Sequence, residues 1–106
     1  MAKEIQSANF FMVSNSIFEF GFTPHTFAVY CCLLRHMSMK TRTCYPSRAE
    51  IAKLCRTSLK TVDKAIKLLC DSGLVQKQAR YGLERGRDSN LYTLADLTKT
   101  AEPRAE

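Results

Sequence analysis

The stretch that decides the fold spans residues 45–77 and reads YPSRAEIAKLCRTSLKTVDKAIKLLCDSGLVQK. It contains two helix starts in close succession. Ser47 with Glu50 three residues later forms the S-x-x-E capping box, which predicts a short helix over residues 48–55. Ser58 can cap a second helix over residues 59–71, and Gly73 suits the left-handed backbone position that follows a helix. The sequence therefore predicts two helices joined by a tight turn.

The second of these helices has two distinct faces when residues are projected at about 100° per position. The apolar face consists of Leu59, Val62, Ile66, Leu69 and Cys70. A narrow basic stripe lies beside it and consists of Lys60, Lys64 and Lys67. Leu68 falls outside the apolar face and is expected to cover a neighbouring strand. The stripe fits either a solvated surface or a surface directed at an anionic ligand, and a single helix does not separate the two.

The chain before this stretch predicts an N-terminal segment, residues 1–22, and a longer helix. The letters NFFMV favour a short strand at residues 9–13, and residues 14–22 favour a turn or single helical turn that ends at Gly21. Thr23 as N-cap and Pro24 at the first position predict a helix over residues 24–39. Its apolar arc is wider than one stripe requires. The surplus is expected to pack on the N-terminal segment, or to form a homodimer contact through that segment or through helix 24–39.

The rest of the chain predicts a small amount of β-structure. A short strand is favoured at residues 43–45, and strands at residues 74–79 and 90–94 form a β-hairpin. The hairpin tip between them is polar, basic and contains glycine, and such tips often carry function. The helices and the hairpin are therefore assigned to one unit, residues 23–95, and residues 96–106 form a polar tail.

Positive charge is concentrated in the middle of the chain. The 106 residues carry a net charge of +6, but positions 35–87 hold thirteen Lys/Arg against four Asp/Glu, a net of +9. The remaining positions hold three basic and six acidic residues. A basic middle of this kind favours an anionic partner, with uneven solvation charge as the alternative.

Other functional classes find little support in the sequence. The five cysteines include no C-x-x-C pair, so neither a zinc site nor another cofactor is expected, and Cys31, Cys55 and Cys70 are predicted to be buried, reduced thiols. No G-x-S-x-G, H-E-x-x-H, P-loop or carboxylate pair is present, so an enzyme is not expected. The longest apolar run has eight residues, and the N-terminus lacks a signal-peptide core. We therefore expect a cytoplasmic protein without a membrane partner.

The order of elements resembles a winged helix-turn-helix domain. The residues that carry the resemblance are Ser58, Thr61, Val62, Leu69, Gly73 and Leu74, together with NLYTL at residues 90–94. Residues 10–54, from FFMV to IAKL, are similar to N-terminal domains of plasmid and phage replication initiators and replisome organisers. The resemblance implies a mainly α fold with a small β-hairpin, a three-helix core plus a wing, and binding of double-stranded DNA.

On this resemblance, each candidate residue receives an expected role at the DNA. The residues nearest base edges would be Ser58, Lys60, Thr61 and Lys64. Phosphates would be held by Ser47, Arg48, Arg56 and Lys67. The wing would contact phosphates or the minor groove through Lys77, Arg80, Arg85 and Arg87. The DNA-binding role would be that of a replication initiator or mobile-element protein; a transcriptional regulator and a protein–protein interaction module are the alternatives.

The turn between the two helices departs from the family pattern. Such turns commonly carry a glycine and then an apolar residue, and the corresponding positions here are Arg56 and Thr57. A non-glycine residue with positive φ costs on the order of 1 kcal/mol. Either the turn adopts another geometry, or Arg56 is retained there for its charge.

Overall fold

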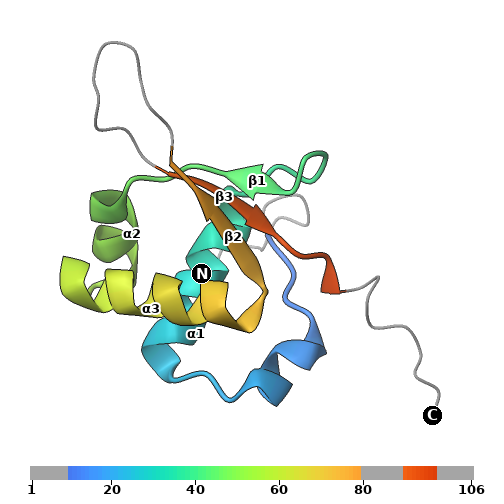
Figure 1. The fold of residues 1–106 in the computed structure, drawn as a ribbon, viewed down its shortest axis with the longest axis horizontal. Helices are drawn as coiled ribbons and strands as arrows, with labels where there is room; N and C mark the ends of the chain where they lie inside the picture. The colour runs from blue at the N-terminus through green and yellow to red at the C-terminus, as the bar shows by residue number, and fades with distance from the viewer. Residues whose placement is uncertain (1–9, 80–89, 98–106) are drawn as a thin grey trace, which may run out of the picture.

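The computed structural model describes residues 10–79 and 90–97 as three helices and a small antiparallel sheet (Figure 1). A 3₁₀ helix, η1 (Asn15–Phe20), precedes α1 (Pro24–His36), and β1 (Thr43–Cys44) leads to α2 (Arg48–Cys55) and α3 (Leu59–Ser72). Strands β2 (Val75–Gln78) and β3 (Leu91–Leu94) follow, and the sheet order is β1-β3-β2. The mainly α fold with a three-helix core, predicted from the sequence, is confirmed.

The capping residues act as the sequence predicts. The hydroxyls of Ser14, Thr23, Ser47 and Ser58 each accept a backbone N–H at the start of their helix. Gly21 and Gly73 follow η1 and α3 in the left-handed conformation, which glycine adopts at little cost. These local signals explain why α2 begins where the sequence places it, and why α3 ends within one residue of the expected position.

One continuous core joins all the elements. Helix α1 packs on both α2 and α3, and α3 also packs on β2. The most deeply buried side chains come from every element and include Ile17, Val29, Leu33, Ile51, Val62, Leu69, Val75, Tyr92 and Leu94. Ile17 belongs to η1, so the segment before α1 contributes to this core, as the wide apolar arc of α1 predicts. Phe18 of η1 also stacks on Phe27 of α1, with ring centroids 5.8 Å apart.

Several predicted boundaries are wrong. Residues 10–13 do not form a strand, and no strand of the sheet pairs with them. Helix α1 ends at His36 rather than at residue 39, because the chain turns there toward β1: Ser38 N–H donates to the Thr43 carbonyl. Strand β1 pairs with β3, so the predicted hairpin is part of a three-stranded sheet. The strands are shorter than predicted by one or two residues, and the hairpin tip and the tail from residue 98 lie outside the described residues.

Candidate nucleic-acid interface

The face of α3 opposite the core is basic, as the sequence predicts. Lys60, Lys64 and Lys67 are all exposed, and the buried residues of the helix are Val62, Ala65, Ile66 and Leu69. Two details differ from expectation. Leu59 is 44% exposed rather than in the core, and Leu68 is 42% exposed rather than covering a strand. The buried face is therefore centred nearer Ala65, which places the three lysines almost directly opposite the core.

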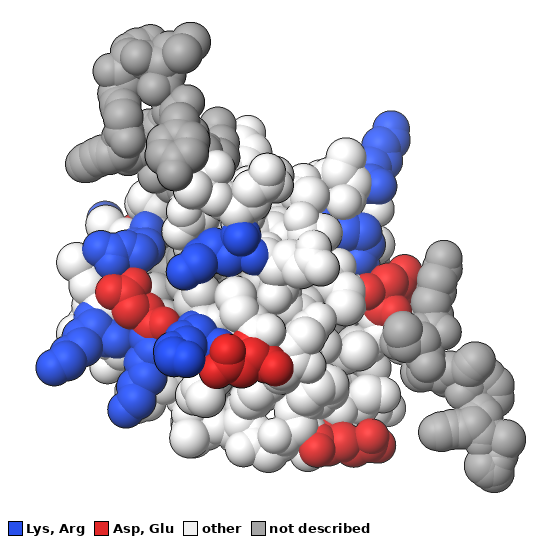
Figure 2. Space-filling view, viewed as in Figure 1, with Lys and Arg blue, Asp and Glu red and all other residues white. Residues whose placement is uncertain are grey.

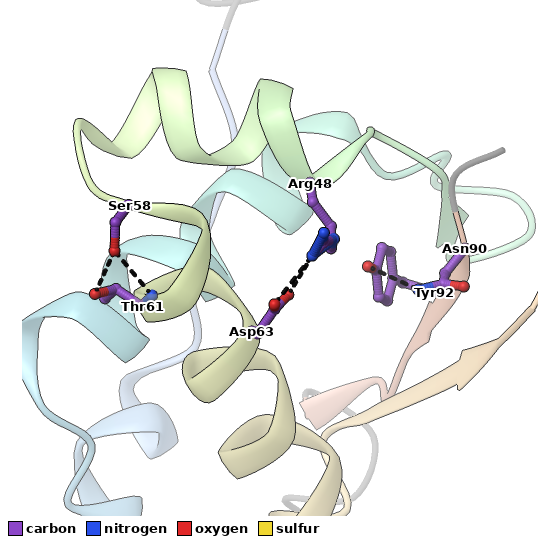
Figure 3. Close-up of polar contacts among 6 residues, drawn as sticks. All are labelled: Arg48, Ser58, Thr61, Asp63, Asn90 and Tyr92. Carbon is purple, nitrogen blue, oxygen red and sulfur yellow. Dashed lines mark hydrogen bonds and ion pairs between the residues drawn. The ribbon is translucent and has the colours of Figure 1, made fainter. Parts of the chain in front are cut away.

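The start of α3 is rigidly capped. Ser58 Oγ accepts the Thr61 N–H at 3.1 Å and donates to Thr61 Oγ1 at 3.0 Å (Figure 3). The hydroxyl groups of Ser58 and Thr61 are thus hydrogen-bonded to each other. Ser47 Oγ similarly accepts the Glu50 N–H at 3.0 Å at the start of α2. Ser47 and Ser58 hold the two helix ends in place, and Thr61 keeps a half-exposed side chain next to the basic stripe.

The turn between α2 and α3 has the left-handed geometry that usually requires glycine. Arg56 has φ 54° and ψ 50°. Its N–H donates to the Lys53 carbonyl at 3.3 Å, and the Thr57 N–H donates to the Ala52 carbonyl at 3.0 Å. These two bonds form the Schellman arrangement that ends a helix. The alternative of a different turn geometry is therefore wrong, and the exposed Arg56 occupies a position where its side chain is not needed for packing.

An ion pair connects α2 and α3. Arg48 Nη1 lies 3.0 Å from Asp63 Oδ1 and 3.0 Å from Asp63 Oδ2. Figure 3 shows the two side chains pointing toward each other, Arg48 from the start of α2 and Asp63 from α3. Their side chains are 44% and 52% exposed. Sequence reasoning assigned Arg48 to phosphate and missed Asp63, because no local spacing links residues fifteen positions apart.

A second carboxylate also lies among the lysines. Lys67 Nζ is 3.3 Å from Asp71 Oδ2, one helical turn further along α3. In the view of Figure 2, blue side chains gather over the side of the molecule where α2 and α3 lie, and red side chains are interspersed among them. The interface is thus a mixed surface with an excess of positive charge, and Asp63 and Asp71 are both paired.

Strand β2 adds one further cation beside α3. Lys77 is exposed and is paired in register with Tyr92 of β3. Burial raises the pKa of the Cys70 thiol on α3, and the positive charge of Lys77 partly offsets this rise. An open groove between the end of α3 and the sheet is lined by Cys70, Val75, Gln76, Lys77, Gln78 and Thr93. The other predicted wing residues, Arg80, Arg85 and Arg87, lie outside the described residues.

Arg42 shows that a basic residue in this region can be structural. It has φ 60°, and its side chain reaches the end of β3: Nε donates to the Leu94 carbonyl at 3.3 Å and Nη2 to the Ala95 carbonyl at 2.7 Å. Its own carbonyl accepts the Leu94 N–H at 2.9 Å. Arg42 therefore fixes the loop before β1 to the sheet, a role that sequence reasoning did not assign.

The cysteines occupy different positions from those predicted. Cys31, Cys55 and Cys70 are half-buried, and the fully buried thiols are Cys32 and Cys44. Burial raises the pKa of Cys32 to about 12 and that of Cys44 to about 11. All five thiols are free. Within residues 10–79 and 90–97, no cluster of three or more His, Cys, Asp or Glu side chains could hold a metal ion.

The segment before α1 carries several large, exposed apolar side chains. Phe10, Phe11, Met12, Phe18 and Phe20 are exposed, and we call them the N-terminal apolar surface. Phe20 stacks on Phe22 with centroids 5.4 Å apart. Large apolar side chains concentrated in one exposed segment are typical of a contact surface. No helix within the described residues is long and apolar enough to cross a bilayer.

Comparison with known proteins identifies this architecture. A model of the family described as helix-turn-helix domain matches residues 21–75. A structure described as a possible transcriptional regulator from Methanosarcina mazei Go1 is similar with a TM-score of 0.58 and 12% identity, over 88% of this chain and 80% of that chain. A MarR family regulator from Neisseria meningitidis gives a TM-score of 0.47 and 20% identity, over 80% of this chain and 58% of that chain. No curated protein sequence gives a significant match.

Proposed function

The chain belongs to the helix-turn-helix domain family, and we propose that it binds double-stranded DNA in a sequence-directed manner through α3 and the basic side chains beside it. The observation that carries the proposal is the exposed row of Lys60, Lys64 and Lys67 opposite the core, on the helix that follows the tight turn. A helix in this position of a helix-turn-helix unit enters the major groove. A duplex carries dense negative charge, which such a row would neutralise.

Each residue of the proposed interface has a role that follows from its position. Lys60 and Lys64 lie in the first half of α3, where side chains meet base edges, and Thr61 can offer its methyl group to a thymine. Phosphates are held by Arg48 and Arg56 near the start of α3 and by Lys67 and Lys77 near its end. Ser47 lies at the start of α2, where backbone N–H groups also favour phosphate, and Ser58 at the start of α3 lies among the residues nearest the base edges.

The first test is the salt dependence of binding. If about 5–7 phosphates are neutralised, the logarithm of the association constant should fall against the logarithm of salt concentration with a slope of about −4 to −6. The measurement is a fluorescence-anisotropy titration of labelled duplexes at several salt concentrations, after selection of a preferred site from random DNA. Binding that does not respond to salt would favour the rival function, a protein–protein interaction module.

The biological role that fits the proposal best is regulation of transcription, without catalysis, in the cytoplasm. The Methanosarcina mazei structure carries the description of a possible transcriptional regulator, and its similarity to this chain is one of fold. Replication initiation is the second candidate, supported by the sequence resemblance of residues 10–54. The position of the selected site in a genome separates the two: an operator overlapping a promoter supports regulation, and an array of repeats at an origin supports initiation.

The proposal includes a homodimer formed through the N-terminal apolar surface. Dimeric helix-turn-helix proteins read two half-sites, which multiplies the sequence information available to one short helix. The exposed aromatic side chains of residues 10–20 supply the apolar area that such a contact needs. A second copy of this chain is therefore the partner that we assign to this surface.

A further inference from the structure

The Arg48–Asp63 ion pair is not explained by the stability of the helices that carry it. Arg48 is the first residue of α2, where the helix dipole disfavours a positive charge. Both side chains are about half exposed, and ion pairs of that kind contribute little to folding stability. Neither local electrostatics nor stability accounts for an arginine and an aspartate at these two positions.

Asp63 is also an unexpected residue on a surface that faces DNA. It lies on α3 between Lys60, three residues before it, and Lys67, four residues after it. A carboxylate there repels phosphates and weakens binding to any duplex. Lysines at these spacings are the usual local partners of an aspartate, yet both oxygens of Asp63 contact Arg48 on the neighbouring helix.

The contact geometry leaves Arg48 able to bind a second group. Both Asp63 oxygens meet the same nitrogen, Nη1, so the Nη2 and Nε donors are not engaged by this carboxylate. A guanidinium is planar and presents its donors in a fixed fork, so anchoring Nη1 also fixes the direction of the remaining donors. Arg48 is thereby held beside α3 rather than free to follow the nearest phosphate.

We propose that Asp63 is a positioning residue for DNA specificity: it anchors Arg48 so that this arginine reaches a phosphate only when α3 is seated in register in the major groove. The inference rests on the proposed DNA binding. On random DNA, α3 is not seated in register, Arg48 stays with Asp63, and the carboxylate repels the backbone. At the preferred site, Nη2 and Nε gain a phosphate oxygen. Asp63 thus lowers non-specific affinity more than specific affinity.

The test compares Asp63→Ala with the matched control Asp71→Ala. Each change removes one negative charge from the exposed face of α3, and each frees one basic partner, Arg48 or Lys67. Asp63→Ala should strengthen binding to random DNA and leave the preferred site nearly unchanged, so that the ratio of the two association constants falls by roughly 3- to 10-fold. Asp71→Ala should strengthen both by the same factor and leave the ratio unchanged.

Two further measurements test whether the change of specificity in Asp63→Ala depends on Arg48. In Asp63→Ala, the salt slope on random DNA should steepen by about one unit, because the released Arg48 joins the non-specific contacts. In an Arg48→Ala background, Asp63→Ala should instead shift both affinities equally, as Asp71→Ala does. Equal specificity ratios for Asp63→Ala and Asp71→Ala would overturn the inference while leaving DNA binding intact. A wild-type protein that binds no duplex, or all duplexes equally, would overturn the proposed function itself and the inference with it.

Discussion

At the scale of single residues, two arginines share a strained backbone conformation but differ in what their side chains do. Arg42 and Arg56 have φ 60° and φ 54°. The Arg42 side chain donates two hydrogen bonds to the Leu94 and Ala95 carbonyls at the end of β3, whereas Arg56 is exposed at the end of α2. The cost of a left-handed arginine is thus offset by structural contacts at position 42. At position 56, the proposed compensation is the positive charge offered to DNA.

Replacement of each arginine by glycine should therefore have opposite effects on stability. Arg56→Gly relieves the left-handed strain without loss of contacts, and it should raise the free energy of unfolding by roughly 0.5–1 kcal/mol. It should also weaken DNA binding and make the salt slope shallower by about one unit. Arg42→Gly loses two hydrogen bonds and should lower the free energy of unfolding by about 1–2 kcal/mol. Urea unfolding followed by circular dichroism measures both values.

The comparison also decides why Arg56 is present. If Arg56→Gly stabilises the protein and binds DNA as tightly as the wild type, the arginine is not retained for its charge. The Arg42→Gly variant is the control for the general effect of placing glycine in these loops. Destabilisation of similar size in both variants would contradict the view that the two side chains have different roles.

At the scale of elements, the proposed interface assigns base contacts to α3 and a phosphate contact to β2. In the proposed interface, Lys64 lies in the part of α3 that would meet base edges, and Lys77 lies on β2. Lys64→Ala should weaken the preferred site by roughly 1–3 kcal/mol and random DNA much less. Lys77→Ala should weaken both by similar amounts and reduce the salt slope by about one unit. Titrations of both variants on both duplexes, at two salt concentrations, provide the measurement.

Both lysines are exposed, so thermal denaturation should show little change for either variant and serves as the control. Equal losses on both duplexes in Lys64→Ala would assign α3 to phosphate contacts alone. An unchanged affinity in both variants would instead favour the protein–protein interaction module.

The elements also show which structural features can be predicted from the sequence alone. Helix α2 was predicted at its observed bounds because serine caps and a tight turn are local signals. The end of α1 was not predicted correctly, because the chain turns toward β1 after His36. The strand expected at residues 9–13 was also wrong, because no strand within the described residues pairs with residues 10–13. The basic stripe of α3 follows from helical spacing. The Asp63–Arg48 contact cannot be predicted in this way, because it joins side chains from two helices whose packing the sequence alone does not specify.

At the scale of the whole molecule, the proposed DNA binding and self-association are assigned to two different surfaces. The basic surface is built on α2, α3 and β2, and the N-terminal apolar surface precedes α1. Because they belong to different elements, a change in one should leave the other intact. Self-association and DNA contact can therefore be tested separately, which is the basis of the last prediction.

Phe18→Ser should dissociate the proposed dimer without unfolding the protein. The Phe18 side chain is 76% exposed, so its replacement removes apolar area from the contact surface but little from the core. The wild type should show concentration-dependent association in sedimentation equilibrium, and the variant should remain a monomer over the same range. Leu68→Ser is the matched control, since Leu68 is an exposed apolar residue on α3 and should leave association unchanged.

The consequence for DNA follows from the geometry of half-sites. A dimer should select a site with two-fold symmetry and half-site centres about 10 base pairs, or a multiple of one helical turn, apart. Phe18→Ser should then bind a single half-site as the wild type does but lose the added affinity for the full site, because the second half-site no longer benefits from a linked partner. A wild-type protein that stays monomeric at high concentration and selects an asymmetric site would assign the N-terminal apolar surface to a partner other than a second copy of this chain.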